Sequence, residues 1–438
     1  MRTTYLKYSI KSFLKMLGMA LTGIVVSISV KAQETYPVTL EKVMELVGAN
    51  NLTIQEFGLK YEQALAEQSK AKEWWLPSIY GGYTTHYLNG AAMNTDGTML
   101  SGVNRDNLWG GLGIAAEVDF GKGIYQNLAA RQKAYAVNHF SRAERNKAIL
   151  NAIQTYYDLQ AAQLQYFFLQ HLANQSDSLS QQIKIQVDSG LMYQSEYLMS
   201  QSNFQHLKIT MLQAKSEWQN KSALLANQLN IENNVSLVSA DTKLVPVSLS
   251  VEQGSETGFE NRPEYQGLQA GLESVQTLRK TDNQGLFIPK LKVGFGNGAF
   301  GSYSTPLYNT AQLNTSLLWN LPLGRLTYNG DLKKHDAKIA LQQNKIEQFK
   351  NQYQQEVSMA NSQVQIAGEQ MKIGKEALLL ASEALNQSIE RQKSGTARAF
   401  EVFQAQQFFL QAQLDYLKAV SEYNKAQFAL KVAKGENL

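Results

Sequence analysis

The sequence has no cysteine and only seven prolines among its 438 residues. The missing cysteine excludes a disulfide framework and any metal or nucleophile chemistry that depends on a thiol. An excess of one charge is also missing from most of the chain. The first 32 residues hold five of the 41 basic residues and no acidic one, so 36 basic residues face 37 acidic residues in the rest. This near-neutral body argues against nucleic acid as a partner.

One apolar run stands out in the sequence, "MLGMALTGIVVSISV" at 16–30, and basic residues precede it. The run is short for a membrane-spanning helix, which needs about 20 apolar residues. Val30 and Ala32 place small residues at both positions of a signal cleavage site. We therefore predict a signal peptide at 1–32 and no transmembrane helix in the mature chain. A retained membrane anchor is the alternative.

Residue patterns typical of catalysis or metal binding are missing as well. No nucleophile motif frames a serine, and the glycine-rich "GFGNG" at 294–298 precedes no predicted helix. The histidines are scattered and form no pair four residues apart, so the sequence predicts no metal site. They are His86, His139, His171, His206 and His335. We therefore expect a protein that is not an enzyme and has no cofactor.

What the chain does contain is an internal repeat. "SGLMYQSEY" at 189–197 and "SGTARAFEV" at 394–402 both place a glutamate six residues after a glycine. An apolar heptad series recurs at the same offset, which indicates a duplicated unit. Tyr197, Phe204, Met211, Trp218 and Leu225 match Val402, Phe409, Tyr416, Tyr423 and Leu430. A strict seven-residue repeat of this kind predicts supercoiled helices.

The repeat extends upstream, where "VDFGKGIYQN" resembles "LPLGRLTYNG" and Gly121 aligns with Gly324. It predicts two structural units, 33–245 and 246–438, each with a helix, two strands, a long helix and a returning helix. In the first unit we expect strands at 78–88 and 108–120 and helices at about 124–188 and 192–230. In the second we expect strands at 289–299 and 312–323 and helices at about 261–285, 326–392 and 397–434.

The two long helices are predicted from proline-free stretches with apolar residues at spacings of four and seven. About 65 helical residues would span roughly 95 Å, which is longer than a compact core needs. The strands are predicted from alternation, because Val293 and Phe295 fall on one face and Lys292 on the other. Such strands are typical of outer-membrane barrels, but also of an ordinary sheet with one wet face. We expect the glycine- and asparagine-rich segments 89–107 and 301–311 to be loops.

Four strands cannot close a barrel, and an open sheet edge cannot lie in lipid because its backbone groups would have no partners. Several chains would therefore have to contribute to one barrel. Eight strands from two chains would be filled by their own side chains, whereas twelve strands from three chains would leave a lumen. A periplasmic coiled-coil scaffold without a barrel is the alternative from another class.

In the order of these features the mature sequence resembles the TolC-like outer-membrane efflux proteins. The resemblance rests on the duplication, the paired strands, the joints "DFGKG" and "PLGRL", the two tip motifs, the opening "VTLEKVMELVGANN", and "NRPEY" at 261–265. The sequence departs from the family at Asn51-Leu52, where members often have Asn-Pro. It also departs at its two Ser-Gly pairs, where members often have Val-Gly.

The resemblance implies a mainly α fold, with long coiled-coil helical hairpins and four antiparallel strands per chain. It implies a homotrimer whose 12-stranded β-barrel, in the lipid of the cell outer membrane, continues into an α-helical barrel across the periplasm. The expected function is a passive exit duct of a tripartite efflux system, with a periplasmic adaptor protein and an inner-membrane transporter as partners. The alternative within the family is the outer-membrane component of type I protein secretion.

The resemblance also places the functional residues at the turns between helices. The tip that docks the adaptor would consist of Ser189, Gly190, Leu191, Ser394, Gly395 and Thr396. In related proteins, acidic side chains at the position matching Glu401 ring the closed pore, and three copies would favour cations. Gln404 stands where relatives carry a second acid, Arg398 is a candidate salt-bridge tether, and Glu196 is the counterpart of Glu401. The alternative for both glutamates is a solvated acid at a helix N-terminus.

Overall fold

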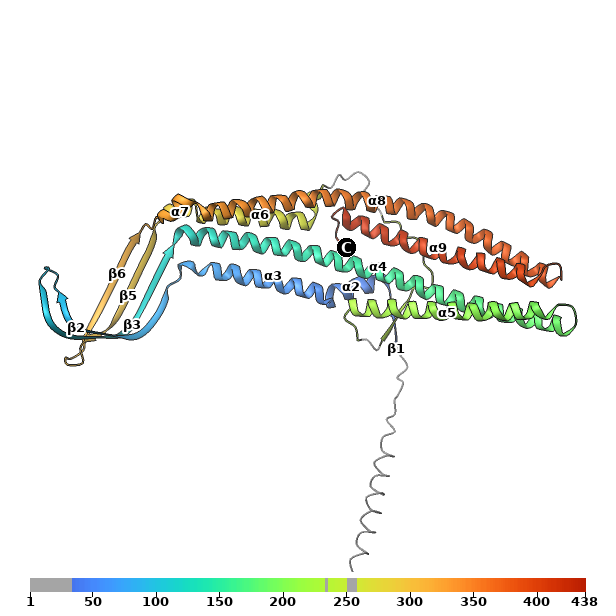
Figure 1. Cartoon of the computed structure of the whole chain (residues 1–438), viewed down its shortest axis with the longest axis horizontal. Helices are drawn as coiled ribbons and strands as arrows, with labels where there is room; N and C mark the ends of the chain where they lie inside the picture. The colour runs from blue at the N-terminus through green and yellow to red at the C-terminus, as the bar shows by residue number, and fades with distance from the viewer. Residues whose placement is uncertain (1–33, 233–234, 250–257) are drawn as a thin grey trace, which may run out of the picture.

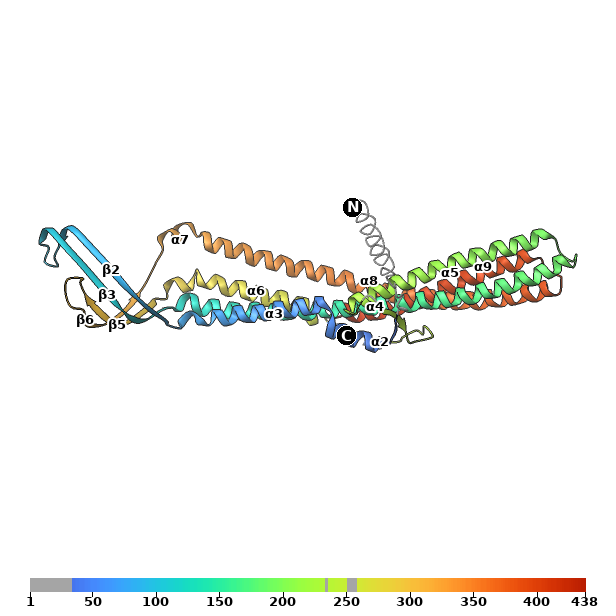
Figure 2. The ribbon, with the colours of Figure 1, turned by 90° about the horizontal axis from the view of Figure 1, so that it is seen from below.

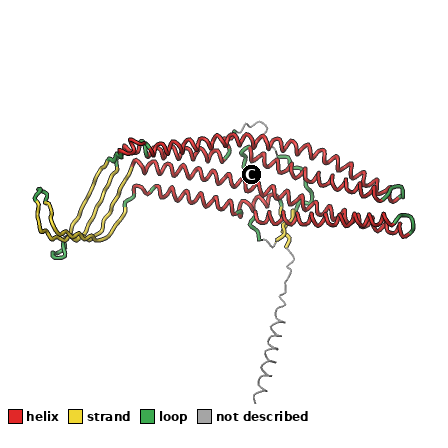
Figure 3. Tube along the Cα trace, viewed as in Figure 1, coloured by secondary structure: helices red, strands yellow, loops and turns green. Residues whose placement is uncertain are grey.

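The computed structural model describes residues 34–232, 235–249 and 258–438, so the predicted signal peptide lies outside the described residues. The described chain is mostly helical and carries a small antiparallel sheet, as the sequence predicted. The molecule is a long rod with the sheet at one end, helices along its length and two helix-to-helix turns at the other end (Figures 1 and 3). None of the described helices combines the length and apolarity that a membrane span requires.

Both halves of the chain place two strands before a long helix and a returning helix. The elements of the first half are β1 (Glu34–Val38), α2 (Leu40–Asn50), α3 (Leu52–Ala71), the 3-10 helix η1 (Glu73–Trp75), β2 (Ser78–Met93), β3 (Met99–Asp119), α4 (Phe120–Asp188), α5 (Gln194–Gln228) and β4 (Val235–Ser239). Those of the second half are η2 (Phe259–Asn261), α6 (Pro263–Thr281), η3 (Gln284–Phe287), β5 (Lys290–Gly301), β6 (Tyr308–Leu318), α7 (Leu323–Tyr328), α8 (Gly330–Lys393) and α9 (Ala399–Ala433).

The four-stranded sheet has the order β2-β3-β5-β6, and every neighbouring pair is antiparallel. The prediction of a loop at 89–107 is wrong, because β2 and β3 continue to a short turn between Met93 and Met99. Glycine allows this hairpin to bend, since Gly90 and Gly102 have positive φ angles of 133° and 72° and the pairing shifts beside Gly90. The β2–β3 hairpin therefore projects past the shorter β5–β6 hairpin (Figure 1).

Predicted boundaries in the second half are also wrong. Strand β6 begins at Tyr308, inside the segment 301–311 that was expected to be a loop. The strand expected at 312–323 ends at Leu318, because its partner β5 begins opposite it at Lys290, directly after Pro289, which has no N–H for a ladder. The helix expected at 326–392 is interrupted at Asn329, whose φ of 52° is left-handed. Asparagine tolerates this conformation better than most residues, so the chain turns between α7 and α8.

Asparagine and aspartate side chains determine where three helices of the first half begin or are interrupted. Asp119 accepts a hydrogen bond from the Lys122 backbone N–H at 3.0 Å, so α4 begins four residues before its predicted start. Asn51 separates α2 from α3, which the sequence had predicted as one helix. Its side-chain oxygen accepts from the Thr53 backbone N–H at 3.0 Å, and its Nδ2 donates to the Gln228 carbonyl at 2.7 Å. Asn51 thus caps α3 and fastens it to the end of α5.

Helix α4 is the central element, since α3, α5, α6 and α9 all pack against it (Figures 1 and 2). The largest apolar cluster lies midway along the rod, where Ile153 and Tyr156 of α4 meet Leu225 of α5 and Val420 of α9. The unpredicted strands β1 and β4 pair in parallel beside this cluster, with Glu34 opposite Val235. The middle of the rod therefore holds the main core, and the two ends extend from it.

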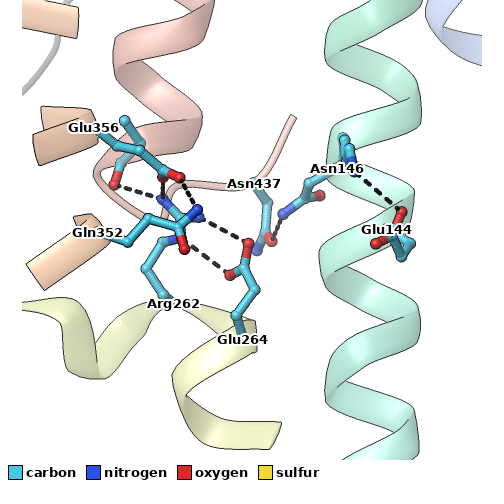
Figure 4. A network of polar contacts seen from close by, with 9 residues as sticks. Glu144, Asn146, Arg262, Glu264, Gln352, Glu356 and Asn437 are labelled. Atoms are coloured by element: carbon cyan, nitrogen blue, oxygen red, sulfur yellow. Dashed lines mark hydrogen bonds and ion pairs between the residues drawn. The ribbon is translucent and has the colours of Figure 1, made fainter. Parts of the chain in front are cut away.

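A buried arginine ties the beginning of the second half to the C-terminal helix (Figure 4). The Arg262 side chain is 8% exposed, and its Nη2 and Nε contact the Glu264 carboxylate at 2.8 and 3.0 Å. Its Nη1 donates to Glu356 of α8 and to the Ala433 carbonyl of α9, both at 3.1 Å. Burial alone would lower the pKa of Arg262, but the two carboxylates raise it above its ordinary value.

Ion pairs also join α4, α5 and α9 in the same part of the rod. Asp158 of α4 contacts Lys425 of α9 at 2.7 Å and Lys221 of α5 at 3.3 Å, and Glu422 approaches Lys425 at 2.7 Å. Burial would lower the pKa of Lys425, but Asp158 and Glu422 raise it above its usual range. The charged form of Lys425 is therefore stabilised where three helices meet.

Candidate functional site

The two helix-to-helix turns at the free end have the same backbone structure. In the first, the Gly190 N–H donates to the Val187 carbonyl at 2.9 Å and the Leu191 N–H donates to Gln186 at 2.8 Å. A glycine with a φ of 75° after the last helical turn and this pair of bonds define a Schellman motif. The Ser189 hydroxyl adds a bond to the Ile185 carbonyl at 2.8 Å.

The second turn repeats each of these features. Gly395 has a φ of 72° and donates to Gln392 at 3.0 Å, and Thr396 donates to the Arg391 carbonyl at 2.9 Å. The Ser394 hydroxyl donates to the Glu390 carbonyl at 2.9 Å. The repeated Ser-Gly pair therefore has a structural cause, since serine satisfies a helix-end carbonyl and glycine adopts the left-handed conformation. The predicted docking role of these turns stays a prediction.

Glu401 lies in the first turn of α9 and is half-buried. One carboxylate oxygen lies 3.4 Å from Nη1 of Arg391, in the last turn of α8, and the other accepts from the Arg398 backbone N–H at 3.5 Å. The sequence analysis missed Arg391, although an antiparallel hairpin brings residues before and after its turn together. Arg398 and Gln404 are both exposed, and the tether role of Arg398 stays a prediction.

Glu196 occupies the matching turn of α5 in a different environment. Its Oε2 is buried and has no hydrogen-bond partner among the described residues. Glu401, in contrast, is paired with an arginine across its turn. The two glutamates match in sequence but differ in surroundings, so Glu401 is the better placed of the two to present charge at the end of the rod.

Polar side chains and an apolar cluster hold the two hairpins together near the tip. Asn203 of α5 donates to Gln406 of α9 at 2.9 Å, and Gln392 of α8 donates to Gln186 of α4 at 3.2 Å. Between these contacts lies an apolar cluster that includes Ile183 of α4 and residues of α8 and α9. The tip is thus a packed four-helix unit whose hairpins are joined by uncharged amides.

The sheet at the opposite end has one apolar face. Residues paired directly across antiparallel strands share a face. The pairings Ile79 with Ile114, Ile114 with Phe295, and Phe295 with Leu313 therefore form one row across all four strands. All four side chains are at least 44% exposed. A face of this kind needs an apolar environment or a partner to cover it.

The other face of the sheet is polar and rich in glycine. Nearest the helices, Lys290 pairs with Asp119 at 2.9 Å and Lys292 pairs with Glu117 at 3.1 Å. Farther along, the paired rows contain glycines together with uncharged polar residues: Ser78, Gly82, Gly111, Gly113, Gly294, Gly296, Gly298, Thr310, Gln312 and Asn314. The alternation of lysine and glycine against leucine, valine and phenylalanine on β5 agrees with the sequence prediction.

Groups suited to metal binding do not occur among the described residues: no set of three or more histidine, aspartate or glutamate side chains is arranged to hold an ion. Of the five histidines, His335 contacts an acid, with Nε2 lying 3.0 Å from Asp282 of the α6 end. This pair joins α8 to α6 beside Arg325, which contacts the same aspartate at 3.0 Å. It is therefore part of the joint between helices.

No protein-family model and no curated protein sequence matches this chain. Solved structures do match it over nearly its whole length. The outer-membrane channel OprN aligns at 16% identity with a TM-score of 0.78, over 91% of this chain and 90% of its own. The outer membrane protein VceC from Vibrio cholerae aligns at 15% identity with a TM-score of 0.75, over 91% of this chain and 96% of its own.

The open state of the MtrE outer membrane channel from Neisseria gonorrhoeae aligns at 16% identity with a TM-score of 0.76, over 91% of this chain and 89% of its own. Structural matches at 15–16% identity show that this chain shares the fold of these proteins. The chain has the fold of TolC-like outer-membrane channels, as the sequence motifs predicted.

Proposed function

We propose that the protein is the outer-membrane exit duct of a tripartite efflux system. The observation that carries this proposal is the sheet, which has one apolar face, one polar face and a direct continuation into long helices. An apolar outer face and a polar inner face are what a barrel wall around water requires. The signal peptide predicted at 1–32 would direct the chain through the inner membrane.

Closure of the barrel requires more than one chain. Strands β2 and β6 are the edges of the four-stranded sheet, and each leaves a row of backbone groups for another strand. Pairing of β6 in one copy with β2 in the next, in a homotrimer, gives a 12-stranded barrel with a lumen. The helices favour the same assembly, because Ile366, Ile373 and Leu380 of α8 are exposed at heptad spacing and suit a neighbouring helix.

In this assembly the helices form a tube across the periplasm, and the Schellman turns form its narrow end. An adaptor protein and an inner-membrane transporter dock there and supply the energy, since the duct itself is passive. Type I protein secretion is the alternative, and export assays in a deletion strain would separate it from efflux of small molecules.

Glu401 supplies the charge at the narrow end. Three copies of its carboxylate would form a ring and favour cations over anions. Arg391, 3.4 Å away, offsets part of this charge. Substitution of the two residues should therefore change ion selectivity in opposite directions: Glu401→Ala weakens the preference for cations, and Arg391→Met strengthens it. Glu196→Gln serves as the matched control and should change selectivity little, because Glu196 Oε2 is buried.

The test is single-channel recording of the detergent-purified chain in planar bilayers under a salt gradient. A small conductance that prefers cations supports the duct, and a preference that falls in Glu401→Ala and rises in Arg391→Met supports its acidic end. If the channel conducts but neither variant changes its ion selectivity, the duct is supported and the role of Glu401 is rejected. A protein that needs no detergent, shows no strand signal in circular dichroism and gives no conductance is a periplasmic coiled-coil scaffold, and the proposal then fails.

A further inference from the structure

On the polar face, the four-stranded part of the sheet ends in a row of aromatic residues, and only β2 and β3 continue beyond it. Trp109 of β3 pairs with Phe300 of β5, and Phe300 pairs with Tyr308 of β6. Direct pairing places the three residues on one face and at one level. Gly111 and Gly298 pair on the polar face. Trp109 and Phe300 are each two residues along the strand from one of these glycines, so they lie on the same face.

This position is unusual for aromatics in a membrane barrel, where aromatic girdles lie on the outer, lipid-facing surface. The next row on the apolar face contains one aromatic, Tyr83, together with a glycine, an alanine and an asparagine. On the polar face, Phe300 is 47% exposed and Tyr308 is 66% exposed. The larger aromatic surface at this level therefore points to the side opposite the predicted lipid.

Glycines bring the aromatic rings close to the sheet surface. A Cβ atom added at Gly296 would lie 3.5 Å from Oη of Tyr80 and 3.8 Å from Cζ2 of Trp109, so both side chains extend over this glycine. Tyr80 also lies over Gly113, where an added Cβ would collide with its ring. Rings that lie along a glycine surface leave one π-face uncovered, which is the geometry of a stacking platform.

The charged side chains of this face lie away from the aromatic row: toward the β2–β3 turn, Arg105 is two rows farther out, beyond the row of His86 and Asn107. The ion pairs of the polar face, Lys290 with Asp119 and Lys292 with Glu117, lie at its other end and neutralise one another. Thr84, which is paired with Trp109, is the fourth member of the aromatic row and is uncharged. A solute in contact with the rings would therefore meet π-faces and hydroxyl groups.

We propose that Tyr80, Trp109, Phe300 and Tyr308 form an aromatic strip inside the outer end of the duct, which binds planar solutes without net charge as they leave. This inference rests on the proposed function, because the polar face becomes a lumen only in the closed barrel. The strip makes the exit end a weak binding site for aromatic cargo, separate from the acidic residues at the opposite end of the rod.

The test uses the full chain in planar bilayers and free tryptophan as the probe, with cyclohexylalanine as a control of similar size and charge but no π-face. Tryptophan should interrupt the current at lower concentration than cyclohexylalanine. Trp109→Leu and Phe300→Leu keep apolar volume but remove a ring face, and each should weaken the tryptophan block about three- to tenfold, the effect of one lost aromatic contact. Trp109→Phe should retain most of the block.

Tyr83→Leu is the matched control, since it removes a ring at a neighbouring level of the apolar face, and it should leave the block unchanged. Equal block by the two amino acids in a conducting channel overturns the aromatic strip and leaves the proposed function intact. The same holds if Tyr83→Leu weakens the block as much as Phe300→Leu does. A wild-type protein that does not conduct overturns both proposals, because the polar face then lines no channel.

Discussion

Substitution of Arg262 should destabilise the protein more than any exposed arginine does. Arg262→Met keeps most of the side chain's apolar stem but removes four hydrogen bonds, two to Glu264, one to Glu356 and one to the Ala433 carbonyl. Loss of one partner of a buried ion pair costs about 3–5 kcal/mol, because the remaining charge is left unpaired in a poorly solvated site.

The lower part of that range applies here. The side chains of Glu264 and Glu356 are 30% and 38% exposed, so water can reach both carboxylates after the guanidinium is removed. We therefore expect the free energy of unfolding to fall by about 3 kcal/mol. The matched control is Arg279→Met on α6. Arg279 contacts Asp336 at 2.6 Å, but both side chains are at least 35% exposed, so its loss should cost less than about 1 kcal/mol.

The measurement is urea unfolding of the purified protein in detergent, followed by helical circular dichroism at one fixed protein concentration, because assembly makes stability depend on concentration. Arg262→Lys separates charge from geometry: a lysine keeps the charge but cannot bind Glu264 through two nitrogens, so it should fall between wild type and Arg262→Met. Equal shifts of the unfolding midpoint for Arg262→Met and Arg279→Met would refute the reasoning, since burial would then have no energetic effect at this site.

Two further predictions concern Gly121 and His139, where the close packing of the folded chain determines the effect of a substitution. Gly121→Ala should strongly destabilise the protein, because a Cβ atom added there would collide with the Gly285 carbonyl. Gly324 is the counterpart of Gly121 in the repeat, and a Cβ atom added there would meet no atom within 4 Å, so Gly324→Ala should be tolerated. Yield and thermal stability of the two variants check this, and an equal loss in both would contradict it. Burial, with a smaller effect of Arg142, lowers the pKa of His139, so the unfolded state binds the proton more readily and stability should fall as pH drops below about 6.5. In urea titrations between pH 8 and 5, the free energy of unfolding should fall less with pH in His139→Gln than in wild type. His171→Gln, at an exposed position, should follow wild type. If His139→Gln shows the same pH dependence as wild type, this histidine is not the cause.

Features that depend on local periodicity were the ones that the sequence could predict. The alternation of Leu291, Val293 and Phe295 correctly separated the two faces of β5. The turns at Gly190 and Gly395 were recognisable because a Schellman motif needs glycine at one fixed position after the last helical turn.

Features that depend on what lies opposite a residue could not be predicted in the same way. The glycines of 89–107 predicted a loop, but partner strands kept the segment extended and used Gly90 and Gly102 for a bend. Arg391 gained its role from the position of Glu401 across the turn. The aromatic strip required the pairing of three strands, since Trp109 and Phe300 are far apart in the sequence.

The parallel pairing of β1 with β4 has a consequence for how the chain acquires its structure. Glu34 lies opposite Val235, so the first described strand has no partner until about 200 further residues have been synthesised. Contacts between such distant residues form slowly, because a long loop must close before the pairing contributes any stability. Since synthesis proceeds from the N-terminus, β1 is the first described strand to be made but cannot pair until the whole α4–α5 hairpin is present. Closure of this small sheet should therefore report completion of the first half, and pulse-labelled amide hydrogen exchange during refolding would follow it directly.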